Sequence, residues 1–315
     1  MVQLLDNQQA LPPSSPIRAA SPSCLAKYQM VLLCSPPPAP LPVDVAATRP
    51  LVQTLATSVA ARAQRLWPRA VPLPLDPRDY IPKSADGKQD TKVVLIRQVP
   101  TRMTGQRKTG YLLWGAAFVL ARWVHLHRDL FAGKSVIEVG SGLGLGGITA
   151  ARYATRTVLT DYQSDTCTAL EYNAQLNRPF THEFEPAKPE IRVSHLDWDV
   201  METIEAVPKA DVLIASDIIC EPSTAEGFLR VVRHHVLGHA SGEGVAYLMN
   251  ANSHSRFGVI HLHALLAASP DLSYSITPVQ KLPDGAQLLE TVSDAQELSY
   301  EFYEIRAAAH KGNNA

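Results

Sequence analysis

The segment SVIEVGSGLGLGGITAA, residues 135–151, is the most informative part of the sequence for predicting the fold. It starts with a short apolar run, continues with five glycines among the eight positions 140–147, and ends in small apolar residues. A strand that turns sharply into a helix has this pattern, because glycine adopts backbone conformations that other residues avoid. The segment therefore predicts a strand, a glycine turn and a helix, with a ligand beside the turn.

The rest of the chain repeats this alternation of strand and helix. Apolar or alternating runs predict strands at 91–99, 135–140, 156–161, 191–197, 211–217, 244–251, 272–279 and 296–305. Helical spacing of apolar residues predicts helices near 111–131, from the glycine turn to 154, and near 164–176, 223–236 and 256–268. Ser223, with Glu226 three residues later, predicts a capping box for the helix at 223–236. The alternation indicates an α/β domain with a mostly parallel sheet covered by helices on both faces.

Composition excludes several classes of protein. The chain has 315 residues and a net charge of -1, whereas a general nucleic-acid-binding protein usually carries an excess of basic residues. Its four cysteines form no C-x-x-C pair, so neither a disulfide framework nor a zinc site is indicated. No apolar run reaches the roughly 18 residues that a membrane-spanning helix needs. We therefore expect no direct nucleic-acid partner, no membrane partner and no metal, and nothing indicates an oligomer.

The N-terminal region differs from the rest of the chain. Residues 1–75 hold 13 of the 24 prolines, and such a segment buries too little apolar surface to offset its ordering entropy. We expect a largely disordered Pro/Ala/Ser-rich extension at 1–90 with a helical segment near 51–67, the α/β domain at 91–306 and a flexible tail at 307–315. We also expect a cytoplasmic location. The alternative is organelle targeting, because the extension is rich in Ser, Ala and Arg and poor in acids.

Three kinds of ligand compete for the glycine turn. A phosphate loop is excluded because no Gly-Lys-Ser/Thr follows the glycines. A dinucleotide fits the G-x-G-x-x-G spacing of Gly142, Gly144 and Gly147, and Asp161 lies 19 residues beyond Gly142, near the distance expected for a ribose-binding acid. Glu138 argues against it, since an ionised carboxylate 4 Å from a pyrophosphate charge is repelled by roughly 4 kcal/mol at an effective dielectric of about 20. A cationic ligand such as S-adenosylmethionine would gain from the same charge.

The ends of the later predicted strands agree with this ligand. HLDWDV, residues 195–200, places Asp197 and Trp198 at a strand end, where a carboxylate and an aromatic ring can hold an adenine. ASD, residues 215–217, closes the next strand. Each residue taken singly also has an explanation in the core, but together they follow successive strand ends, which is where ligands bind in such folds.

These motifs resemble a known family. TGYLLWGAAFVLARWV, VIEVGSGLGLGGI, VLTDY, HLDWDV and DVLIASDIICEP occur in this order, and the set is similar to the seven-β-strand protein-lysine methyltransferases of methyltransferase family 16, notably the branch that modifies elongation factor 2. The resemblance covers roughly residues 91–306. It implies a Rossmann-like seven-stranded class I methyltransferase sheet with one antiparallel strand, S-adenosylmethionine (SAM) as cofactor and a protein lysine, on elongation factor 2 in that branch, as substrate.

The resemblance also implies roles for individual residues. Trp114 would contact the adenosyl group, the turn with Glu138 would hold the methionine end, and Asp161 would bind the ribose. The full predicted cofactor set is Trp114, Glu138, Gly140, Ser141, Gly142, Gly144, Asp161, Tyr162, Asp197, Trp198 and Ser216. The family usually has Asp-x-x-Tyr after the fourth strand, whereas this chain has Cys220 at the tyrosine position. That departure puts the shape of the lysine channel, and activity itself, in question.

Asp217 is the predicted catalytic residue, because its carboxylate could orient an acceptor amine. Capping of the following helix is an equally good explanation for it. His235 and His239 are spaced like metal ligands on a helix, but no glutamate accompanies them and we expect solvated surface. The open alternatives to lysine methylation are methylation of histidine, an amino terminus or a small amine, a SAM-binding module without turnover and, more distantly, an NAD-dependent oxidoreductase.

Overall fold

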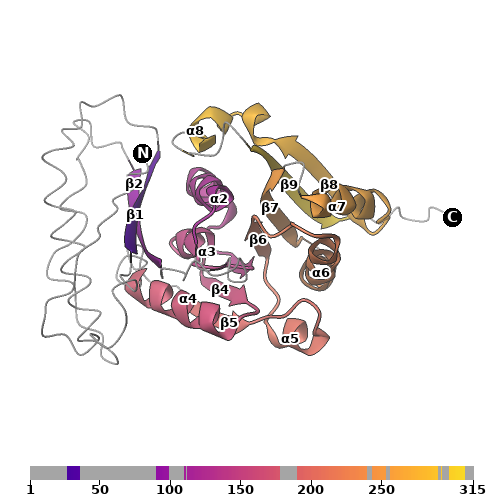
Figure 1. Ribbon diagram of the computed structural model, residues 1–315, viewed down its shortest axis with the longest axis horizontal. Helices are drawn as coiled ribbons and strands as arrows, with labels where there is room; N and C mark the ends of the chain where they lie inside the picture. Colours follow the sequence, from indigo (N-terminus) through magenta and orange to yellow (C-terminus); the bar gives the residue numbers. More distant parts are fainter. Residues whose placement is uncertain are drawn as a thin grey trace, which may run out of the picture. The chain divides into compact units, whose positions relative to one another are not determined.

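The computed structural model describes two units of the chain, which are treated separately (Figure 1). The described residues are 27–35, 90–98, 110, 112–177, 190–239, 243–252, 256–289, 292 and 298–308. The predicted helix near 51–67 and most of the C-terminal tail lie outside them. In the first unit, β1 (Lys27–Ser35) pairs antiparallel with β2 (Asp90–Gln98) in a two-stranded sheet.

Two features of this strand pairing were not expected from the sequence. The predicted N-terminal extension contributes the strand β1, which the sequence analysis did not anticipate. The strand expected at 91–99 forms as β2, but it pairs with β1 and not with the large sheet. Its apolar run was read correctly as a strand, while its partner, about 60 residues away in sequence, could not be read from local pattern.

The second unit, residues 112–315, contains a seven-stranded sheet with the order β5-β4-β3-β6-β7-β9-β8. Its strands are β3 (Ser135–Val139), β4 (Arg156–Asp161), β5 (Glu190–His195), β6 (Val212–Ser216), β7 (Val245–Asn252), β8 (Leu272–Pro278) and β9 (Ser299–Ala307). The pairs among β3 to β7 are parallel, whereas β9 runs antiparallel to both β7 and β8. The prediction of a mostly parallel seven-stranded sheet with one antiparallel strand is confirmed.

Helices cover both faces of this sheet (Figure 1). They are α2 (Gly115–Leu126), α3 (Leu145–Ala150), α4 (Ser164–Asn177), α5 (Met201–Ala206), α6 (Pro222–Val232), α7 (Phe257–Ala267) and α8 (Gly285–Leu289), with short turns at Arg128–Leu130, Arg233–Leu237 and Val279–Lys281. Successive strand residues point to opposite faces. Val136 accordingly packs in the core with α2 and α8, whereas Ile137 packs in the core with α5, α6 and α7.

The start of α6 corrects one sequence prediction. Its N-cap is Glu221, with Pro222 in the first turn, and the backbone amide of Glu221 donates to Thr224 Oγ1 over 3.2 Å. The predicted box of Ser223 and Glu226 is therefore wrong. Proline fixes the first helical dihedral and lacks the amide that a cap would satisfy, so it outweighs the serine signal.

Candidate active site

Most of the predicted site residues lie at one edge of the large sheet. The chain proceeds from β3 outward through β4 to β5, and then returns to the other side of β3 with β6. This reversal of strand order at β3 and β6 leaves a crevice beyond the carboxyl ends of the strands. The segments that follow these strands carry most of the predicted residues. Asp161 and Ser216 are the last residues of their own strands and lie at the same edge. Glu138 and Trp114 are the two exceptions.

The glycine turn is fixed to its neighbours by backbone geometry. Gly140, Gly142 and Gly144 have φ values of 62°, 53° and 85°, a region that L-residues rarely adopt. A Cβ added at Gly140 would lie 2.7 Å from Ile218 Cγ2, so the backbone of the turn approaches the segment after β6. The hydroxyl of Ser141 accepts from the amide of Thr160 over 3.0 Å, and its own amide donates to Thr160 O over 2.8 Å. The turn is therefore anchored to β4.

Glu138 lies beneath the helix that follows the turn. It is 2% exposed, and Cβ atoms added at Gly146 and Gly147 would lie 2.5 and 2.7 Å from its two carboxyl oxygens. These two glycines thus make space for the carboxyl group. Its Oε2 has no hydrogen-bond partner among the described residues. Burial raises the pKa of Glu138 from 4.5 to about 8.

This environment changes the argument for a cationic ligand. With a pKa of about 8, Glu138 is mostly protonated at pH 7. The premise that an ionised Glu138 repels a pyrophosphate is therefore not supported. A contact of Glu138 with the cofactor stays a prediction.

Asp161 joins the turn to the end of β4. Its Oδ2 accepts from the amide of Gly142 over 3.1 Å and its Oδ1 from the amide of Gln163 over 3.2 Å. Burial raises its pKa, while these backbone donors oppose the increase. A carboxylate oxygen has more than one acceptor position, so the group can still bind a ribose diol. The neighbouring Tyr162 is 57% exposed at the same edge.

Asp197 and Trp198 lie in a tight turn after β5. The amide of Asp197 donates to Thr203 Oγ1 over 2.9 Å, and its Oδ1 accepts from the amide of Asp199 over 3.0 Å. The ring of Trp198 is half-buried, and its Cζ2 lies 3.5 Å from the Cβ position of Gly140. The structure thus brings the aromatic ring and the glycine turn together, as the sequence predicted from strand-end positions.

Asp217 has an unusual backbone and a strong ionic partner. Its φ is 56°, the only positive value among the described non-glycine residues. Its side chain is 6% exposed and forms an ion pair with Arg256, with 2.6 Å between Oδ1 and Nη1 and 3.1 Å between Oδ2 and Nη2. Because the N-cap of α6 is Glu221, Asp217 is not the cap of that helix. A left-handed conformation at a non-glycine residue stores strain and is often found at functional sites.

Cys220 lies beside the same guanidinium. Arg256 Nη1 is 3.4 Å from its Sγ. Burial raises the pKa of the Cys220 thiol, against a smaller lowering by Arg256. A raised pKa keeps the thiol protonated at pH 7, so this side chain is a poor nucleophile.

Trp114 and Ser216 occupy less informative positions. Trp114 is the N-cap residue of α2 and is 41% exposed. Ser216 ends β6 and pairs with Met249 of β7. Both remain predicted cofactor residues.

The histidines that follow α6 correct a further prediction. His235 is fully buried, and both of its ring nitrogens lack a hydrogen-bond partner among the described residues. Burial lowers its pKa to about 4. The expectation of a solvated histidine is therefore wrong at His235, because α6 continues as a π-helical turn, Arg233–Leu237, that packs this ring inward. No group of three or more His, Cys, Asp or Glu side chains in the described part of the chain could hold a metal ion.

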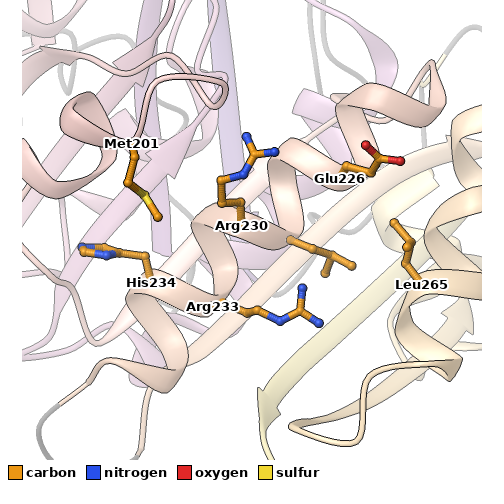
Figure 2. Close-up of a pocket in the computed structure, with 7 residues that line it drawn as sticks. Met201, Glu226, Arg230, Arg233, His234 and Leu265 are labelled. Atoms are coloured by element: carbon orange, nitrogen blue, oxygen red, sulfur yellow. The ribbon is translucent and has the colours of Figure 1, made fainter.

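Sequence reasoning singled out none of three residues that shape the site. Arg256 pairs with Asp217, Gly227 of α6 lies against Trp198, and Arg230 donates from Nη1 to Trp198 O. The segment 252–258, which contains Arg256, follows β7, and this strand-end position fits the substrate side and a plain loop equally well. The two α6 residues reach the site only through tertiary packing. Arg230 also lines a groove of about 430 Å³ between α5, α6 and α7 (Figure 2).

Several curated proteins are similar in sequence to parts of this chain. Histone-arginine methyltransferase METTL23 of Mus musculus is 31% identical over 129 residues, which are 39% of this chain and 46% of the relative. Protein-lysine N-methyltransferase EEF2KMT of Bos taurus is 29% identical over 149 residues, 42% of this chain and 44% of the relative. Methyltransferase-like protein 22 of Mus musculus is 25% identical over 207 residues, 61% and 51% of the two chains. The chain spans about half the length of the curated relatives that it matches.

Solved structures and a family model were also compared. An O-methyltransferase from Bacillus cereus in complex with SAH has a TM-score of 0.42 and 13% identity, covering 64% of this chain and 84% of that chain. The family model of methyltransferase family 16, described as lysine methyltransferase, matches residues 98–258, just over half of the chain. The match includes β3 to β7, the glycine turn and both Asp217 and Arg256. The chain therefore belongs to methyltransferase family 16.

Proposed function

We propose that this chain transfers a methyl group from SAM to a lysine side chain of a protein. Family membership and the name of the relative EEF2KMT support the reaction class. The observation that carries the proposal is the hydrogen bond from the Gly142 amide to Asp161, because it builds the glycine turn and an acidic strand end into one ligand-binding unit. When bound, SAM supplies a methyl group activated by a sulfonium.

The residues at the sheet edge fit this cofactor. Asp161 keeps acceptor positions for the two ribose hydroxyls, and Trp198 offers an aromatic face beside Gly140 for the adenine. The anchored turn exposes its backbone to the amino-acid end. Glu138, protonated at pH 7, can become ionised when a cationic group lies nearby, since an opposite charge lowers the pKa of a carboxyl group.

The acceptor side must keep an amine neutral. A lysine with a pKa of about 10.4 is deprotonated at pH 7 at a free-energy cost of about 5 kcal/mol. A lone Asp217 carboxylate would increase this cost by favouring the charged ammonium form. Arg256 offsets that charge, and its own positive charge lowers the pKa of a nearby amine. Asp217 can then accept a hydrogen bond from the amine through its remaining acceptor positions.

The test is transfer of labelled methyl groups to proteins of a cell extract, followed by mass spectrometry of the modified residue. We expect methyllysine in one or a few proteins, and elongation factor 2 is the first purified substrate to try. The Asp161→Ala variant is the matched control and should lose the signal. Absence of labelling by the wild-type chain in every protein fraction, with SAM binding intact, would refute catalysis and leave a SAM-binding module.

Arginine is the second candidate acceptor. Asp217 holds the guanidinium of Arg256 through an ion pair and a hydrogen bond, which shows that this carboxylate can accept a guanidinium group. The name of the relative METTL23 agrees with this candidate. The same mass spectra distinguish methylarginine from methyllysine.

The cytoplasmic location stays a prediction. Among the described residues, no helix is both long enough and apolar enough to cross a membrane.

A further inference from the structure

Helix α6 contains a glycine in its interior. Gly227 lies at the sixth position of Pro222–Val232, where glycine is less favourable for helix formation than alanine. A Cβ added there would lie 2.9 Å from Trp198 Cβ and 3.1 Å from Trp198 Cε3. The first distance is shorter than real Cβ contacts, so any larger residue at 227 must displace Trp198 or the helix.

The opposite end of the same indole faces the glycine turn. Trp198 Cζ2 lies 3.5 Å from the Cβ position of Gly140, an ordinary van der Waals distance. The ring is thus placed between α6 and the turn that follows β3. A shift of Trp198 away from Gly227 would therefore change the space beside Gly140.

A second α6 residue holds the backbone of this tryptophan. Arg230, one turn after Gly227, donates from Nη1 to Trp198 O and lies 3.3 Å from Asp199 Oδ1. Figure 2 shows its side chain between those of Met201 and Glu226. Arg233 lines the same groove but bonds elsewhere, with 2.8 Å from Nε to Asp271 Oδ2 and 2.6 Å from Nη2 to Ser269 Oγ.

We propose that Gly227 and Arg230 are positioning residues that set the place of Trp198, and through it the affinity for the adenine of SAM. Gly227 lets the indole lie close against α6, and Arg230 fixes the carbonyl of the same residue. The inference rests on the proposed function, because it assumes that SAM binds beside Gly140. Neither residue contacts the transferred methyl group in this account.

The experiment measures SAM binding to the full chain by isothermal titration, without an acceptor. We expect Gly227→Ala to raise the dissociation constant at least tenfold and Arg230→Gln at least threefold. Arg233→Gln, the matched control in the same groove, should stay within twofold of the wild type. The acrylamide quenching of Trp198, obtained by difference from a Trp198→Phe background, should increase in the first two variants and not in the third.

The outcomes separate the two proposals. A wild-type chain without affinity for SAM overturns the proposed function and this inference together. A wild-type chain that binds SAM, with a folded Gly227→Ala variant of unchanged affinity and quenching, overturns the inference alone. If Gly227→Ala does not fold, Arg230→Gln decides in the same way, since it adds no atom next to Trp198.

Discussion

Replacement of Glu138 by glutamine tests the buried carboxyl group beneath α3. Glutamine has nearly the same shape but cannot ionise, so the variant removes only the protonation equilibrium. In the folded chain the pKa of Glu138 is about 8, against an ordinary value of 4.5. Between these pH values the folded state binds more protons at this residue than the unfolded state. The free energy of unfolding therefore falls as the pH rises across this interval.

The size of the change in the free energy of unfolding follows from the difference between the two pKa values of Glu138. One pKa unit corresponds to about 1.4 kcal/mol, so the span from 4.5 to about 8 corresponds to about 5 kcal/mol. This is a large part of the 5–15 kcal/mol, roughly, that stabilises a typical domain. We expect the stability of Glu138→Gln relative to the wild type to increase by up to about 5 kcal/mol between pH 4 and pH 9.

Urea unfolding at a series of pH values measures this difference. The comparison between variant and wild type cancels the contributions of all other titrating groups that the substitution leaves unchanged. The exposed Glu202→Gln serves as the control and should show no such trend. A difference between Glu138→Gln and the wild type that stays constant within about 1 kcal/mol from pH 4 to pH 9 would refute the assignment of a buried, protonated carboxyl group.

Four further predictions concern other residues of the same unit. Gly144→Ala places a Cβ 2.5 Å from Leu170 Cδ1 at a φ of 85° and should lower the free energy of unfolding by about 2–4 kcal/mol. Gly133 also has a positive φ, but a Cβ there would lie in open space. Gly133→Ala should therefore lower the free energy of unfolding by only about 1–2 kcal/mol in the same urea titration. The wild type should lose about 3 kcal/mol of stability between pH 6.5 and about 4, because the unfolded state binds a proton at His235 in this interval and the buried ring does not. His235→Phe should lack this loss, and an unchanged acid transition would contradict the prediction. Asp161→Asn should weaken SAM binding at least tenfold in calorimetry while NAD binds to neither protein. Arg256→Gln should lower the rate of methyl transfer at least tenfold at pH 7 and shift the pH–rate profile to higher pH, since Asp217 loses its counter-charge. A profile with the same pH dependence as that of the wild type would refute the role of the pair.

Local pattern predicted many elements of the unit that contains the seven-stranded sheet. The strand at 156–161 has the predicted bounds, and the helix expected at 164–176 ends one residue later. The period of apolar residues carries this information directly. The strand-end rule then placed Asp161, Trp198 and Asp217 at one edge, because parallel strands bring their carboxyl ends together.

Local sequence pattern is enough to predict the α/β class and the glycine turn, since both are encoded by neighbouring residues along the chain, and the family resemblance adds the candidate cofactor residues. Only the tertiary structure decided that β2 pairs with β1, that Glu138 is buried and mostly protonated, and that Arg256 neutralises Asp217. It also placed Gly227 against Trp198. Strand pairing, desolvation and ion pairs depend on contacts between residues far apart in the sequence, and the local spacing of apolar residues holds no information about those contacts.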